Sequence, residues 1–205
     1  MKNRIIILAC LLAIAAGCTI LPERAQVALY QPVVHFDAPT SAVEPVVWRL
    51  ALARTAASGQ LNTPRILVRP APDYIEVYPQ AAWVESAATL LGNALFEALE
   101  ADARITALHR ASVGLERDFE LLVELRAFEL ELADGPRARL RLRADLLRQP
   151  SGRAVAHRVF EISQPADGQG VAAAVAALGT CLQQLLPQVA DWVVTQAQSD
   201  WQSEP

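Results

Sequence analysis

Two long stretches of the chain carry apolar residues with the helical period. In residues 83–101 these recur at i, i+3, i+4 and i+7, which predicts an amphipathic helix with one buried stripe. Ser86 could start this helix internally, but we expect the first turn to include Glu85 or earlier residues, because carboxylates suit the positive end of the helix dipole. Residues 169–198 predict the last helix. Pro187 should kink or split it, because proline lacks a backbone N–H and clashes with the preceding turn.

Between these helices the apolar period changes to two, as in half-buried strands. We predict strands at 119–132, 137–147 and 153–162, joined by turns into an antiparallel meander. The alternation slips by one residue after Ala127, which predicts a β-bulge in the first strand. Arginines alternate with apolar residues along the second strand, and we interpret them as a solvated face rather than a binding site. The preceding strand offers them cross-strand partners, namely Glu120, Glu124, Glu129 and Glu131.

The region before the first helix contains short extended segments. Residues 46–54 alternate, and 66–68 and 75–78 are shorter apolar pieces that end at prolines. The intervening residues 55–64 contain glycine and asparagine and are predicted to form a loop. Residues 19–43 hold three prolines and show little periodicity, so we expect a tether, part of which could dock as an edge strand.

Together these elements predict an α+β fold, with a mainly antiparallel mixed sheet and two long amphipathic helices packed on one of its faces. We expect a single α/β domain over residues 44–198, which is long enough to bury a good-sized core. A lipidated N-terminus and tether at 18–43 should precede the domain, and a frayed tail at 199–205 should follow it.

The first residues have the three parts of an export signal. Lys2 and Arg4 supply a positive start, and residues 5–14 form an apolar run that is too short to cross a bilayer as a helix. Three small residues then precede Cys18, which is the pattern of a lipobox. We therefore expect residues 1–17 to be a lipoprotein signal peptide and the mature chain to begin at a lipid-modified Cys18. The alternative is an ordinary secreted protein that is cleaved elsewhere.

Charge and cysteine content narrow the class of partner. The chain has 18 basic and 22 acidic side chains, and loss of Lys2 and Arg4 with the signal leaves a net charge of −6. Such a surface argues against nucleic acid or an anionic membrane face as the main partner. Apart from Cys18, the mature chain has one thiol, Cys181, and its apolar helical context predicts a buried core residue rather than a nucleophile. We expect the lipid alone to attach the protein to its membrane.

Motifs of catalysis and metal binding are missing from the sequence. His35, His109 and His157 lie in unrelated contexts without a second ligand at helical or hairpin spacing, which argues against a zinc site. The chain has no G-x-S-x-G, P-loop or G-x-G-x-x-G motif. We therefore expect no catalytic residue, no metal and no cofactor, and a protein that is not an enzyme.

Several stretches, taken in order, resemble one family. They read Leu-Asn-Thr-Pro-Arg-Ile-Leu-Val-Arg, Val-Tyr, Ala-Trp-Val-Glu, Leu-Phe-Glu-Ala-Leu and Leu-Leu-Val-Glu-Leu-Arg-Ala-Phe, at residues 61–69, 77–78, 82–85, 95–99 and 121–128. With Trp192 in the last predicted helix, they resemble the ABC-type transport auxiliary lipoproteins, which include the paraquat-inducible lipoprotein. Asn62 is a departure, since Asp is commoner at that position in the family.

The resemblance implies a non-enzymatic, lipid-anchored auxiliary subunit of an ABC-type system that moves phospholipid between the inner and outer membranes. Such a subunit would face the periplasm and dock a substrate-binding protein of the mammalian-cell-entry class at a membrane. Thr19 stands where Asp would favour the inner membrane, so we expect the outer membrane. The alternative is a structural envelope lipoprotein that assembles a secretion or outer-membrane complex. Whether the protein also forms a homo-oligomer is open.

Leu61, Asn62, Thr63 and Pro64 are the candidate partner-binding residues. They belong to a loop, and core packing does not obviously explain why the loop has this composition. Loops held by a rigid scaffold commonly bind partner molecules. An unpaired sheet edge is the second candidate, because it can recruit a partner by main-chain pairing. Trp83 is interpreted as a core residue that fills the junction between the neighbouring strand and helix.

Overall fold

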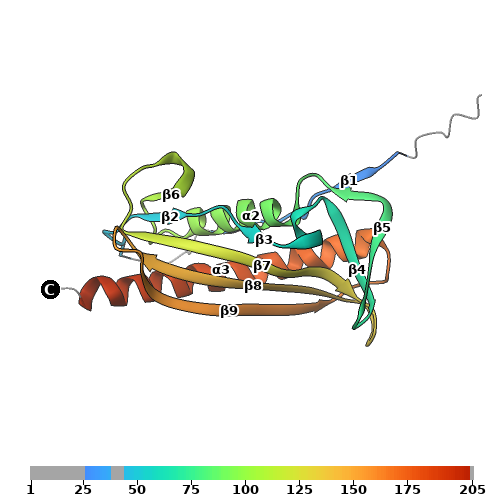
Figure 1. The fold of residues 1–205 in the computed structure, drawn as a ribbon. Coiled ribbons are helices and arrows are strands. Elements are labelled where there is room, and N and C mark those ends of the chain that lie inside the picture. Colours follow the sequence, from blue (N-terminus) through green and yellow to red (C-terminus); the bar gives the residue numbers. More distant parts are fainter. Residues whose placement is uncertain (1–25, 38–43, 204–205) are drawn as a thin grey trace, which may run out of the picture.

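The computed structural model describes residues 26–37 and 44–203. The predicted signal peptide and Cys18 lie outside the described residues, and so do residues 38–43 of the predicted tether. The described chain forms one mixed sheet whose one face is covered by two α-helices, as Figure 1 shows. These helices are α2 (Ala87–Ala101) and α3 (Val171–Ser203).

Nine strands make up the sheet: β1 (Ala28–Tyr30), β2 (Leu50–Leu52), β3 (Ala56–Ala57), β4 (Arg65–Ala71), β5 (Tyr74–Trp83), β6 (Leu108–Arg110), β7 (Phe119–Glu131), β8 (Arg137–Arg148) and β9 (Arg153–Pro165). The long strand β7 is the central one. One of its edges pairs with β8, and β2, β3 and β4 lie in turn along its other edge. These three short strands therefore act as one interrupted strand beside β7. The sheet continues through β5 to β1, and through β8 to β9.

The direction of the strands differs from the prediction of a mainly antiparallel sheet. Five pairings are parallel: β1 with β5, β2 with β6, and β7 with each of β2, β3 and β4. Three are antiparallel: β4 with β5, β7 with β8, and β8 with β9. The chain passes through α2 before it returns in β6 and β7, and a helical connection over the sheet lets strands run in the same direction. Apolar alternation identifies the buried face of a strand but not its direction.

The meander formed by β7, β8 and β9 confirms the predicted hairpins. The register between β7 and β8 shifts at Arg126, which is the extra residue of a β-bulge and adjoins the predicted slip. The predicted cross-strand ion pairs are confirmed in part. Arg139 on β8 bridges Glu131 on β7 at 2.9 Å and Glu161 on β9 at 2.8 Å.

Helix α2 begins just after Ser86, later than the prediction, which placed Glu85 or earlier residues in the first turn. The Ser86 hydroxyl accepts the backbone N–H of Thr89 at 3.2 Å, which satisfies one of the donors left open at a helix start. Strand β5 runs up to Trp83, so this tryptophan ends a strand instead of opening the helix. Its side chain is fully buried and its ring centroid lies 5.4 Å from that of Phe128, which confirms its packing role.

Helix α3 continues through Pro187 and past the predicted end at Gln198. Pro187 is exposed, so water can reach the carbonyl that loses its helical partner. Residues 199–203 are helical rather than frayed, because Trp201 packs against Phe119 with 6.4 Å between ring centroids. By length and composition α3 could also cross a membrane, but its apolar stripe is buried against the sheet, as in the core helix of a folded domain.

Residues 26–37 belong to the folded domain, which therefore starts before the predicted boundary at residue 44. Strand β1 confirms the expectation that part of the N-terminal stretch docks as an edge strand. The chain then crosses α3 at Gly179, with Pro32 buried. A Cβ at Gly179 would lie 3.3 Å from the carbonyl oxygen of Val33, so the missing side chain lets the two backbones approach closely.

Candidate functional site

The loop predicted to bind a partner forms a short 3₁₀ helix, η1 (Gly59–Asn62), and its exit toward β4. Leu61 is half-buried against the core. The hydroxyl of Thr63 donates to a carbonyl within the loop at 2.7 Å, and the carbonyl of Pro64 accepts the N–H at the end of β5 at 2.7 Å. Asn62 is exposed, and its side chain makes no hydrogen bond within the described part of the chain. Three of the four predicted residues therefore contribute to packing or hydrogen bonding within the fold, and the Asn62 side chain is available to bind a partner.

A cavity of about 410 Å³ lies beside Asn62. It is enclosed by the chain after β2, by η1, by the first turns of α2 and by the segment that follows β6. Its polar lining consists of Arg54, Thr55, Asn62, Thr89, Asn93, Arg110 and Ser112. No carboxylate belongs to this lining. Sequence reasoning singled out only Asn62, because no local motif links residues that come from four separate segments.

Close packing of Thr55 against α2 forms one wall of this cavity. The Thr55 side chain is buried, and its Oγ1 has no hydrogen-bond partner among the described residues. A Cβ at Gly92 would lie 2.7 Å from this oxygen, far inside ordinary contact distance. The glycine therefore sets how closely the helix approaches the chain after β2.

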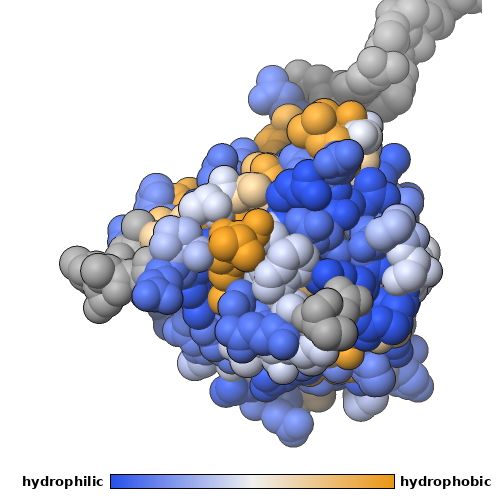
Figure 2. All heavy atoms as spheres, turned by 90° about the vertical axis from the view of Figure 1, so that its left-hand side faces the viewer, coloured by the Kyte–Doolittle hydropathy of each residue, from blue (hydrophilic) through white to orange (hydrophobic). Residues whose placement is uncertain are grey.

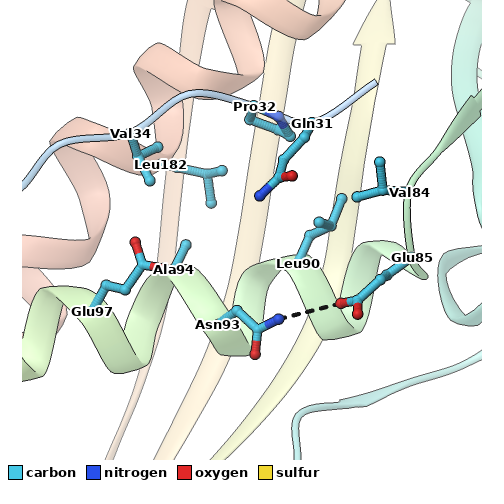
Figure 3. A pocket seen from close by; sticks show the side chains of 10 residues that line it. All are labelled: Gln31, Pro32, Val34, Val84, Glu85, Leu90, Asn93, Ala94, Glu97 and Leu182. Atoms are coloured by element: carbon cyan, nitrogen blue, oxygen red, sulfur yellow. Dashed lines mark hydrogen bonds between the residues drawn. The ribbon is translucent and has the colours of Figure 1, made fainter. Parts of the chain in front are cut away.

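A second hollow shares Asn93 with the cavity and lies beneath the N-terminal segment (Figure 3). It has a volume of about 290 Å³ and separates Gln31 and Val34 from α2, with Leu182 of α3 behind them. The Nδ2 of Asn93 donates to Glu85 at 3.2 Å along the α2 side of this hollow. Unlike the cavity beside Asn62, the hollow carries carboxylates and no arginine.

Among the described strands, β1 and β6 are outermost on one side of the sheet, and β9 is outermost on the other. Leu29 on β1 is 66% exposed, and Val27 just before it is 55% exposed. On β9, Val159 is 41% exposed. Strands β1 and β9 thus each present one edge that no other described strand pairs with, beside exposed apolar side chains, as the edge hypothesis requires.

The end of the molecule near β6 and the C-terminus, which lies opposite the end that carries β1 (Figure 1), also exposes apolar side chains. Val47 lies before β2, and Val113 and Leu115 follow β6. Figure 2 views this end and shows separate hydrophobic patches within a mainly hydrophilic surface. Single exposed apolar residues are ordinary on protein surfaces, so these patches alone do not define a site.

Catalytic chemistry finds little support in the described residues. Burial raises the pKa of the Cys181 thiol to about 11, so this group is not a poised nucleophile. Within residues 26–37 and 44–203, no three His, Cys, Asp or Glu side chains gather as metal ligands would.

The chain matches the family described as ABC-type transport auxiliary lipoprotein component over residues 34–190. Protein XCC0632 of Xanthomonas campestris, whose crystal structure is solved, is 31% identical with a TM-score of 0.80, covering 86% of this chain and 100% of that one. Another solved protein, 16% identical with a TM-score of 0.64 over 82% of this chain and 99% of that one, shows a similar fold. Protein bll6063 of Bradyrhizobium diazoefficiens is 27% identical over 146 residues, which span 71% of this chain and 39% of that protein.

The family match covers well over half of the chain, and the likeness to XCC0632 extends over that protein's whole solved structure. The family is named for an auxiliary transport component and not for an enzymatic activity. Its members are lipoproteins, that is, cell-envelope proteins held by lipid. The family match, the fold and the order of the family-like sequence stretches along the chain lead to one conclusion: the protein belongs to the ABC-type transport auxiliary lipoprotein family.

Proposed function

We propose that this protein is the lipid-anchored auxiliary subunit of an ABC-type system that moves phospholipid between the inner and outer membranes. In this role it docks a substrate-binding protein of the mammalian-cell-entry class at a membrane and faces the periplasm. The match to the auxiliary lipoprotein family over residues 34–190 is the observation that carries the proposal. Thr19 favours the outer membrane as the site of attachment.

The proposed anchor at Cys18 would hold the domain close to its membrane. Gln26, where the described chain begins, follows Cys18 by only eight positions. A fully extended chain of that length spans at most about 27 Å. Because the folded domain includes residues 26–37, the tether is shorter than the stretch of 18–43 expected from the sequence, and the end that carries β1 stays near the membrane.

We propose that the partner binds at the loop of Leu61 to Pro64 or at the exposed edge of the sheet. Asn62 supports the loop, because its amide is exposed, unpaired within the described chain and next to a cavity. Leu29 supports the edge, because β1 offers both free main-chain groups and an apolar side chain.

Photo-crosslinking distinguishes these surfaces. A photoreactive residue is placed at Asn62, at Leu29 or at Ala176, an exposed position on α3, and the protein is irradiated in cells that carry the partner system. We expect capture of a mammalian-cell-entry class protein from Asn62 or Leu29, and none from Ala176. Capture from Ala176 alone would show that the partner binds the helical face and would refute the proposed surface.

A substitution tests the loop directly. Asn62→Ala should weaken partner binding by about tenfold, the loss expected of one recognition residue worth about 1.4 kcal/mol. Its melting temperature should stay unchanged, because Asn62 supports no other described residue. Leu61→Ala is a poor test, since Leu61 packs on the core. The matched control is Gln188→Ala on exposed α3, which should leave partner binding intact.

Co-purification separates the proposal from the alternative of a structural envelope lipoprotein. The tagged protein, extracted with mild detergent, should bring down a mammalian-cell-entry class protein and its permease. Recovery of secretion or outer-membrane assembly components in their place would favour the alternative and contradict transport.

A further inference from the structure

The cavity beside Asn62 is positively charged, although most of the described arginines form ion pairs with carboxylates. Nine described arginines form an ion pair with a carboxylate at 3.4 Å or less, namely Arg49, Arg69, Arg104, Arg117, Arg126, Arg139, Arg141, Arg143 and Arg153. Arg54 and Arg110 line the cavity together, and neither has a carboxylate partner in the described part of the chain. Two uncompensated guanidinium groups at one cavity need an explanation, because like charges repel each other.

Arg110 is held in place without being neutralised. Its guanidinium lies 4.5 Å from the centroid of the Phe96 ring, and its Nη2 donates to the Oδ1 of Asn93 at 2.9 Å. Glu85 fixes the orientation of the Asn93 amide by accepting from Nδ2 at 3.2 Å, and it lines the neighbouring hollow instead of this cavity. A guanidinium has five N–H donors, so Arg110 keeps donors free in a pre-set position.

The other polar groups of the cavity complete a set of donors. Arg54 is exposed and makes no hydrogen bond or ion pair to another described residue, so its side chain can turn toward a ligand. The Ser112 hydroxyl and the Asn62 amide also lack partners among the residues that the structure describes. These groups come from different segments of the chain, so the donors that line the cavity are supplied by more than one element.

We propose that this cavity binds the phosphate group of a small phosphate ester. Paired guanidinium groups suit a phosphate oxyanion, which accepts bidentate hydrogen bonds from arginine and carries up to two charges. Donors supplied by several segments suit the four oxygens of a phosphate, which accepts more hydrogen bonds than a carboxylate with two oxygens. The volume of about 410 Å³ lies within the range of small-molecule sites, so there is room for a group esterified to the phosphate. A lipid headgroup and a free solute both carry this phosphate, and the chemistry of recognition is the same for the two.

Calorimetric titration of the mature protein, purified in non-ionic detergent and phosphate-free buffer, tests this proposal. The two probes are inorganic phosphate and glycerophosphoethanolamine, a lipid headgroup without its acyl chains. Arg54→Gln and Arg110→Gln should each weaken binding by about tenfold or more, as expected for lost charge-assisted hydrogen bonds. Arg158→Gln is the matched control. Like Arg110 it lies over an aromatic ring, at 4.7 Å from Phe160, but it is on β9 and outside the cavity.

Saturable binding that both cavity variants weaken and the control leaves unchanged would support the site. Tighter binding of glycerophosphoethanolamine assigns the site to a lipid headgroup, and equal or tighter binding of inorganic phosphate assigns it to a free phosphate. The proposal is overturned if neither probe shows saturable binding. It is also overturned if Arg158→Gln loses as much affinity as the cavity variants. If Arg110→Gln lowers the melting temperature, the result for Arg54→Gln is the decisive one. Arg54 makes no hydrogen bond or ion pair to a described residue, so its substitution should leave the fold intact. No partner protein enters the titration, so its outcome is independent of the proposed docking function.

Discussion

One buried ion pair fastens β4 to β7 and offers a quantitative test of the fold. Glu129 on β7 is 3% exposed and accepts two hydrogen bonds from Arg69 on β4, at 2.8 and 3.1 Å. These hydrogen bonds raise the pKa of the Arg69 guanidinium, which stays charged. Arg69→Met keeps an unbranched apolar stem but removes the charged guanidinium, so it leaves the Glu129 carboxylate buried without its arginine partner.

The expected cost follows from the burial of the two groups. Removal of one partner from a buried pair costs about 3–5 kcal/mol, because the remaining charge is desolvated without compensation. The Arg69 side chain is 23% exposed, which lets water approach Glu129 in the variant and favours the lower limit, about 3 kcal/mol. In the double variant Arg69→Met with Glu129→Leu, no charge is left buried. Its stability should therefore lie within about 1 kcal/mol of the parent.

Urea denaturation of the purified mature protein, followed by fluorescence of its four tryptophans, measures these differences. With a slope of about 2 kcal/mol per molar urea, Arg69→Met should lower the midpoint by about 1.5 M. The double variant should regain most of this loss. A midpoint for Arg69→Met within about 0.3 M of the parent, or a double variant no more stable than the single one, would refute the argument that a lone buried carboxylate dominates the cost.

Three further predictions address the anchor, the acid range and the wall of the cavity. Cys18→Ser should leave the protein unprocessed or soluble, and a processed, lipid-labelled Cys18→Ser protein in the membrane fraction would contradict the proposed anchor. The urea midpoint should be steady from pH 7 to about 5 and fall below about pH 4, because arginine partners lower the pKa values of Asp102, Asp118 and Asp145. The stabilisation from these pairs is lost as the pH falls through the lowered pKa values, and a flat profile down to pH 3 would contradict this prediction. Gly92→Ala should destabilise by about 1–2 kcal/mol, since overpacking against Thr55 outweighs the gain in helix propensity, and the added substitution Thr55→Ala should reverse the loss in the same denaturation assay.

The acidic prediction depends on opposing effects at two of these carboxyls. At Asp102 desolvation raises the pKa, but hydrogen bonds and charge attraction from Arg104 together lower it further than burial raises it. Asp118 has the same balance with Arg49 as its partner. A carboxyl with a lowered pKa binds protons more weakly in the folded than in the unfolded chain, so acid favours unfolding.

The sequence by itself determined the local elements of this protein, and it predicts an export signal that lies outside the described residues. Alternation over residues 119–162 predicted the β7–β9 meander and its bulge, and the apolar stripes predicted both helices. These features are local, because the side-chain period of a strand or helix is fixed by its own geometry. The apolar period did not determine where the helices begin and end. Ser86 as the cap and Trp201 as a packed residue depend on hydrogen bonds and contacts that the period does not express.

Only the tertiary structure decided the direction of the strands, the place of the N-terminal segment and the cavity. The lineup of β2, β3 and β4 along one edge of β7 is a non-local pairing, and the same alternation would fit either direction. Gly179 lets the N-terminal segment lie close to α3 because it has no side chain, and a missing side chain adds nothing to the apolar pattern of the sequence. Arg54 and Arg110 meet at one cavity because β2 pairs with β6 and both precede loops at the same end. The physical reason is common to all three: packing depends on which surfaces the folded chain brings together, and a local period records only which side of each element is apolar.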